Sequence, residues 1–257
     1  DTGTRGSGQV MVPLTMKYQD REREQVKKKT KTPQKQAVDS HMHAGQIKTR
    51  ERVRDLAEVY THKREVEAML DLVSDMFPSD AEPGNTDRKF LEPAAGSGNF
   101  LEEILRRKLA YVTAYRYRQL PVYEYRILRS LASIYAIDID SENVQECKDR
   151  LRAVIQSHLD NDRNTRVVSV GFASAVEVIL ETNVLCADTL RDAHAIEFID
   201  YQPNRGGTFI REWSPLANSG AQLRLFDYPS RDAVPVHYSE LAGFPGPVSG
   251  RTVRTKR

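Results

Sequence analysis

The segment from Glu92 to Phe100 has the residue types and the spacing of a ligand-binding turn. Gly96 and Gly98 follow the short segment Lys89-Phe90-Leu91, which we expect to form a buried strand. Glycine lets the backbone turn sharply and approach a ligand with no side chain in between. The amides at the start of the helix that follows favour a negatively charged group. Taken alone, the segment is also compatible with an ordinary tight turn between a strand and a helix.

Two common nucleotide-binding motifs do not fit this segment. A phosphate-binding loop requires Gly-Lys-Ser/Thr, whereas Asn99 follows Gly98 here. A dinucleotide fingerprint requires a small residue three positions after the second glycine, where this chain has Leu101, and an acid about 20 residues further on. The acid that ends the next predicted strand is Asp138, well beyond that position. The turn therefore favours neither a P-loop nor a dinucleotide site.

Two carboxylates follow later predicted strands. Asp138 comes directly after the apolar run at 134–137, and Asp188 comes shortly after the run at 184–186. A carboxylate at the end of a strand can accept hydrogen bonds from both hydroxyls of a ribose. Taken singly, each aspartate is equally compatible with a loop cap. We expect Asp140 to cap the helix predicted over 141–158.

The elements that position these residues alternate between strand and helix. Helices are predicted over 46–57, 63–76, 100–117, 123–132, 141–158 and 172–180, and strands over 89–91, 134–137, 184–186 and 195–201, with Pro121 interrupting the helical pattern. This alternation predicts an α/β fold with a parallel sheet covered on both faces. The sheet has fewer strands than such a core usually has, so we expect it to be incomplete, with a helical segment before it.

Composition suggests one core between two basic ends. Residues 1–44 form a basic, weakly ordered arm, 45–205 the core, and 206–257 an irregular Pro/Gly-rich basic tail. The arm is either a solvated tail or a contact to phosphate. A net charge of +2 with 39% hydrophobic and 29% charged residues fits a globular chain that is no generic binder of polyanions.

The chain gives no sign of a membrane segment, a secretion signal or a metal site. No apolar run approaches the length of about 18 residues that a membrane span needs, and the first residues are polar. Cys147 and Cys186 are far apart, and His41 and His43 have no partnering cluster. We therefore expect a cytoplasmic protein without metal or membrane partner.

The residues from Phe90 to Phe100, with the sequence FLEPAAGSGNF, resemble the S-adenosylmethionine motif of N6-adenine-specific DNA methyltransferases, including those of restriction-modification systems. Other motifs occur in the family's order. The segment 57–61 resembles the N-terminal cofactor segment, with Ala57 and His62 where the family usually has Gly and Pro. The segments 136–140 and 187–190 resemble the second and third cofactor motifs. The resemblance covers roughly residues 46 to 225.

The resemblance implies a Rossmann-like methyltransferase core that binds S-adenosylmethionine. Thr61 would hold the methionine end, Asp138 the ribose hydroxyls, Ile139 the adenine face and Asp188 the adenine amino group. The cofactor-binding residues that it implies are Val59, Tyr60, Thr61, Glu92, Pro93, Ala94, Gly96, Gly98, Asn99, Phe100, Asp138, Ile139, Asp188 and Thr189.

The family's catalytic segment, Asn/Asp/Ser-Pro-Pro-aromatic, is not found in this sequence, so the catalytic residues are not identified. The segment 200–203, with the sequence DYQP, has the wrong order, and 214–216 lacks the second proline and the aromatic residue. We therefore expect the cofactor-binding part of a DNA adenine-N6 methyltransferase that acts on DNA together with a complementary methyltransferase or specificity chain. The alternatives are an inactive S-adenosylmethionine-binding regulatory subunit, or a methyltransferase for RNA or protein with an acceptor site around Asp200.

Overall fold

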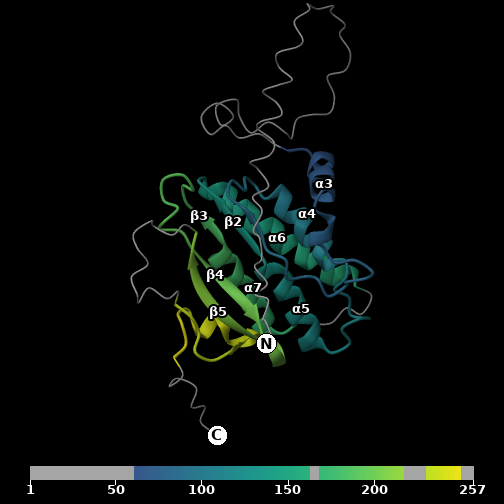
Figure 1. The fold of residues 1–257 in the computed structure, drawn as a ribbon. Coiled ribbons are helices and arrows are strands. Elements are labelled where there is room, and N and C mark those ends of the chain that lie inside the picture. Colours follow the sequence, from purple (N-terminus) through teal and green to yellow (C-terminus); the bar gives the residue numbers. More distant parts are fainter. Residues whose placement is uncertain (1–60, 163–167, 217–229, 250–257) are drawn as a thin grey trace, which may run out of the picture.

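The computed structural model describes residues 61–162, 168–216 and 230–249 (Figure 1). The α-helices are α3 (Lys63–Asp71), α4 (Asn99–Leu109), α5 (Leu120–Ala132), α6 (Ser141–Asn161) and α7 (Val170–Asn183). The strands are β1 (Phe90–Glu92), β2 (Ile134–Asp138), β3 (Val184–Cys186), β4 (Glu197–Pro203), β5 (Thr208–Pro215) and β6 (Val236–His237). Short 3-10 helices cover Ser74–Met76, Arg205–Gly207 and Tyr238–Gly243. The arm 1–44, the predicted helix 46–57, Val59 and Tyr60 lie outside the described residues.

The first three strands form a parallel sheet in the order β1-β2-β3. Helices α4 and α5 connect β1 to β2, and α6 and α7 connect β2 to β3. Parallel strands require such crossover connections, because each new strand must start at the same end of the sheet. The predicted α/β fold with a parallel sheet is thereby confirmed.

The two faces of this sheet are covered differently. Successive residues of a strand point to opposite faces. One face carries Phe90, Ile134, Ala136 and Val184, which belong to the main core with the buried residues of the helices. The other face carries Leu91, Tyr135, Ile137 and Leu185, which pack in a smaller cluster with Ile196, Phe198 and Leu216. Residues from β4 and the chain on either side of the hairpin thus cover the second face.

The strand predicted over 195–201 is present as β4, but it pairs antiparallel with β5 in a second sheet of order β4-β5-β6. Gly206 and Gly207, with φ of 67° and 74°, form the turn of this hairpin. The prediction of an irregular tail after Gly206 is therefore wrong for β5. The alternate residues Phe209, Arg211 and Trp213 are buried. Because one of these buried positions holds a charged arginine, the sequence lacks the alternating apolar pattern by which a strand is predicted.

Several helix boundaries also differ from the sequence prediction. The helix predicted to extend to residue 117 ends at Leu109, and a loop connects it to α5. Pro121 lies in the first turn of α5 and does not interrupt a helix, because a proline there lacks only an amide that would have no helical partner. Asp140 caps α6 as predicted, since its side chain accepts a hydrogen bond of 2.8 Å from the Glu142 amide.

A buried ion pair fastens the segment 230–249 to the hairpin. Arg211 is fully buried, and its Nε and Nη2 donate to the two Asp232 carboxylate oxygens at 2.9 and 3.0 Å. The same guanidinium donates to the carbonyl oxygens of Phe244 and Gly246. Asp232 also accepts a hydrogen bond from the Val248 amide at 2.9 Å. One arginine therefore connects β5 to three points of the segment that follows it.

We predict that Arg211→Met lowers the free energy of unfolding by about 3–5 kcal/mol, because it leaves the Asp232 carboxylate buried without its counter-charge. Urea denaturation followed by circular dichroism measures the effect. The exposed neighbour Arg231 is the matched control, and Arg231→Met is expected to change stability by less than about 0.5 kcal/mol. Equal effects of the two substitutions would show that the buried pair does not stabilise the fold.

Candidate functional site

The segments singled out from the sequence meet at the carboxyl edge of the parallel sheet. Glu92, Asp138 and Cys186 are the last residues of β1, β2 and β3. Backbone hydrogen bonds connect the loops that follow: the Ala95 amide donates to the Ile137 carbonyl at 2.9 Å, and the Ala187 amide to the Asp138 carbonyl at 3.0 Å. The turn with the two glycines and the loop that contains Asp188 are thus both attached to the end of β2.

Asp138 holds the glycine turn (residues 93–98) through its side chain. Its Oδ2 accepts a hydrogen bond of 2.7 Å from the Gly96 amide. Its Oδ1 accepts from the Asp140 amide at 2.9 Å and from the Asn143 side-chain amide at 3.3 Å. A carboxylate has about four acceptor positions, so roughly one remains for a ligand. Asp138 can therefore accept one further hydrogen bond from a ligand while it keeps the turn in place.

The two glycines are required for different reasons. Gly98 has φ of 90°, and a Cβ on it would lie 2.7 Å from Cys147 Sγ, so α6 packs directly against this residue. Gly96 has φ of 52°, and a Cβ built on it would meet nothing within 4 Å. The positive φ favours glycine at both positions. Gly98 allows close packing of α6, and Gly96 leaves open space beside the turn where a ligand can approach.

Glu92 carries a buried acceptor that lacks a partner. The side chain is 2% exposed, and its Oε1 accepts a hydrogen bond of 3.2 Å from the Ala94 amide. Its Oε2 has no hydrogen-bond partner in the part of the chain that the structure describes. Burial, with a smaller contribution from the nearby Asp138 charge, raises the pKa of Glu92 to about 7. An unsatisfied buried oxygen beside an open turn fits a bound cationic or hydrogen-bond-donating group.

The loop after β3 contacts the glycine turn. Thr189 Oγ1 donates a hydrogen bond of 2.8 Å to the Pro93 carbonyl. Asp188 Oδ1 accepts from the amides of Leu190 and Arg191 at 2.9 and 3.1 Å, so this side chain caps its own turn. Its contact to an adenine amino group stays a prediction. Leu190 is 96% exposed.

The remaining predicted site residues surround the same turn. Asn99 begins α4, and its side-chain amide donates to the Thr61 carbonyl at 3.4 Å. Ile139 is 59% exposed directly after Asp138, and Ala94 is exposed in the turn. Phe100 is partly buried against the main core. Hydrogen bonds therefore connect Asp138 to Gly96, Asn99 to Thr61 and Thr189 to Pro93. Ile139 and Asp188 lie next to these residues in the sequence. Sequence analysis missed two residues of α6: Asn143, which contacts Asp138, and Arg150, which contacts Asn99.

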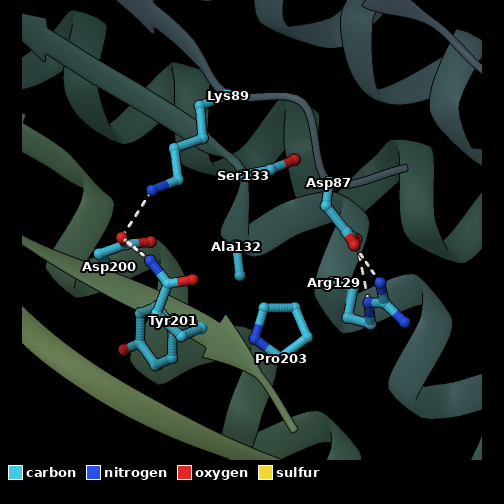
Figure 2. Close-up of a pocket in the computed structure, with 9 residues that line it drawn as sticks. Asp87, Lys89, Arg129, Ala132, Ser133, Asp200, Tyr201 and Pro203 are labelled. Carbon is cyan, nitrogen blue, oxygen red and sulfur yellow. Dashed lines mark hydrogen bonds and ion pairs between the residues drawn. The ribbon is translucent and has the colours of Figure 1, made fainter. Parts of the chain in front are cut away.

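A separate polar pocket lies at the opposite edge of the parallel sheet (Figure 2). Its volume is about 110 Å³, and it is lined by Asp87, Lys89, Arg129, Ala132, Ser133, Asp200, Tyr201, Gln202 and Pro203. Lys89 and Ser133 immediately precede β1 and β2, which places the pocket at the amino ends of these strands. Glu92 and Asp138 are at the carboxyl ends. The pocket and the glycine turn are thus on different edges of the sheet.

The charged groups of this pocket are paired with one another. Lys89 Nζ donates to Asp200 at 2.5 Å, Gln202 donates to the same carboxylate, and Arg129 pairs with Asp87. Tyr201 is 3% exposed, and its hydroxyl is 2.9 Å from Thr182 Oγ1, so its ring is not available for stacking on a base. These contacts give no support to an acceptor site around Asp200.

Comparisons of the chain with protein-family models, curated proteins and solved structures found no match. Within the described ranges, no group of three or more His, Cys, Asp or Glu side chains is placed to hold a metal ion. None of the helices described has the length and apolar character to cross a membrane.

We predict that Glu92→Gln changes how stability depends on pH. The pKa of Glu92 is about 7 in the fold, against 4.5 for an ordinary glutamate side chain. Because the folded pKa is raised, the stability that this group contributes is present at low pH and is lost as pH rises toward neutrality. The variant should therefore match the wild type at about pH 4.5 and exceed it at about pH 8 by roughly 1–3 kcal/mol. Denaturant unfolding across this range measures the difference, and a difference independent of pH would contradict the assignment.

Proposed function

We propose that this chain binds S-adenosylmethionine at the carboxyl edge of the β1-β2-β3 sheet, on a Rossmann-like methyltransferase core. The observation that carries the proposal is the convergence of four segments that are distant in sequence. Thr61, the glycine turn, Asp138 and Thr189 are connected by side-chain hydrogen bonds at this edge. The sequence resemblance assigned these same segments to one cofactor, and their convergence supports that reading.

The chemistry of the donor and acceptor groups fits this cofactor. The unpaired Oε2 of Glu92 suits its amino group, and the first amides of α4 suit its carboxylate. The remaining acceptor position of Asp138 suits a ribose hydroxyl. Ile139 offers an exposed apolar surface for the adenine ring. When bound, S-adenosylmethionine supplies an electrophilic methyl group; the protein residues named here bind and orient it.

We further propose that the chain is the cofactor-binding part of a DNA adenine-N6 methyltransferase of restriction-modification type, and that a second chain completes it. Activating an exocyclic amino group requires acceptors and an aromatic stacking partner for a flipped base. The sequence has no segment of that type, and the polar groups around Asp200 are at the other edge of the sheet. DNA and a complementary methyltransferase or specificity chain are therefore the proposed partners. The two free cysteines fit a reducing compartment such as the cytoplasm.

The missing acceptor segment also favours a second candidate, a regulatory subunit that binds S-adenosylmethionine without chemistry. The two candidates share the cofactor site and differ only in whether a partner chain gives methyl transfer. An RNA or protein methyltransferase is less well supported, because the pocket at Asp200 offers no free acceptor near the glycine turn.

We predict that Asp138→Ala weakens binding of S-adenosylhomocysteine roughly ten-fold or more, because it removes a charge-assisted hydrogen bond and the side-chain support of the turn. Isothermal titration calorimetry measures the affinity. Asp140→Ala is the matched control, since it removes a helix cap two residues away and should cost about 1 kcal/mol of stability with little effect on affinity. Equal affinity of the Asp138 variant and the wild type would refute the site.

We predict that the chain alone does not methylate DNA and does so with a complementary chain. Without an acceptor segment, positioning and transition-state stabilisation of the adenine amino group are both lost. A radiolabelled methyl-transfer assay on mixed-sequence duplex DNA, with and without the products of neighbouring genes, measures this. Transfer by the isolated chain would contradict the split-enzyme proposal, and cofactor binding without transfer in every combination would support the regulatory subunit.

A further inference from the structure

Helix α6 contributes more to the glycine turn than the cap at its start. Cys147 packs against Gly98 so closely that a Cβ on the glycine would lie 2.7 Å from the thiol sulfur. Arg150 follows one helical turn later, on the same side of α6. Its Nη1 donates a hydrogen bond of 2.5 Å to Asn99 Oδ1, at the first residue of α4. The helix therefore contacts the turn through both a packed thiol and a guanidinium.

The guanidinium fixes which way the Asn99 amide faces. Arginine has five N–H donors and no acceptor, so only the Asn99 oxygen can face Arg150. The Asn99 nitrogen must then face the other way, where it donates to the Thr61 carbonyl at 3.4 Å. This 3.4 Å bond is long, so it depends on the amide being held in one orientation. Arg150 thus acts on the Thr61 backbone through Asn99.

The charge of Arg150 is already compensated. Its Nη2 and Nε donate to Glu146 Oε1 at 2.7 and 3.2 Å, and its Nη1 is 3.6 Å from Glu102 Oε2. The side chain is 29% exposed. A guanidinium with two carboxylates beside it is poorly suited to bind the cofactor carboxylate directly. Its geometry suits it to hold other groups in place.

We propose that Arg150 is a positioning residue for the cofactor site: acting through Asn99, it holds Thr61 against the start of α4, where the methionine end of the cofactor binds. This inference rests on the proposed function. It also explains why three segments distant in sequence, at Thr61, at the glycine turn and in α6, are connected by one chain of hydrogen bonds. The alternative is a surface ion pair between Arg150 and Glu146 that affects stability alone.

The test is calorimetric titration of S-adenosylhomocysteine into the full chain and its variants, with the melting temperature of each recorded. Arg150→Ala should weaken binding roughly five- to twenty-fold, consistent with losing one charge-assisted contact. Arg150→Lys keeps one donor for Asn99 and should recover part of the affinity. Arg152→Ala is the matched control on the same helix, because Arg152 pairs with Glu177 and Asp149, away from the turn. It should bind as the wild type does.

Asn99→Asp separates positioning from stability. The substitution keeps an acceptor for Arg150 and adds a negative charge at the start of α4, which favours the helix. It also places an oxygen opposite the Thr61 carbonyl in place of the donor, and a negative charge beside the position proposed for the cofactor carboxylate, so both effects lower its affinity. We expect its melting temperature to equal or exceed that of the wild type while its affinity falls at least roughly five-fold.

Three outcomes overturn the inference, and they are distinguishable. If the wild type binds and the Arg150→Ala variant binds equally well, the positioning role is wrong and the proposed cofactor site stands, whatever the Asn99→Asp variant does. If affinity falls only in proportion to melting temperature, including in the Arg152→Ala control, the role is structural. If the wild type does not bind S-adenosylhomocysteine, the proposed function and the inference built on it both fail.

Discussion

The carboxylate of Asp138 is the interaction on which the arrangement at the sheet edge depends. It ends β2 and accepts hydrogen bonds from the Gly96 amide, the Asp140 amide and the Asn143 side chain. One side chain thereby fixes the glycine turn after β1 and the start of α6 relative to the central strand. The turn lies between β1 and α4, so the hydrogen bond from the Gly96 amide to Asp138 also orients the first amides of α4.

The two faces of the β1-β2-β3 sheet are covered by different elements. The helices bury one face, and Ile196 and Phe198 cover the other from the side of the hairpin. A three-stranded parallel sheet cannot leave an apolar face in water, so the hairpin is part of the core. The buried pair of Arg211 and Asp232 in turn fastens the segment after the hairpin.

The sequence predicts those features of the fold that depend on local apolar periodicity and on turn-forming residues. The strands before Glu92, Asp138 and Asp188, the cap at Asp140 and the presence of β4 follow from residues near one another in the chain. The pairing of β4 with β5 does not follow from such local patterns, because the buried Arg211 interrupts the apolar alternation of β5. Pro121 predicts an interruption of the helical pattern, whereas in the structure it lies in the first turn of α5, where proline is tolerated. The isolated oxygen of Glu92 and the contact from Arg150 to Asn99 depend on packing between distant segments, which no spacing in the sequence encodes.

We propose that the carboxyl edge of the β1-β2-β3 sheet, and not the pocket at Asp200, binds S-adenosylmethionine. Hydrogen–deuterium exchange of the full chain, measured by mass spectrometry with and without S-adenosylhomocysteine, tests it most directly, because ligand contact slows amide exchange locally. We expect protection in peptides that cover 94–100, 138–140 and 187–190, with none in peptides that cover 87–89 and 200–203. Protection confined to the second set, or no protection anywhere at saturating ligand, would contradict it.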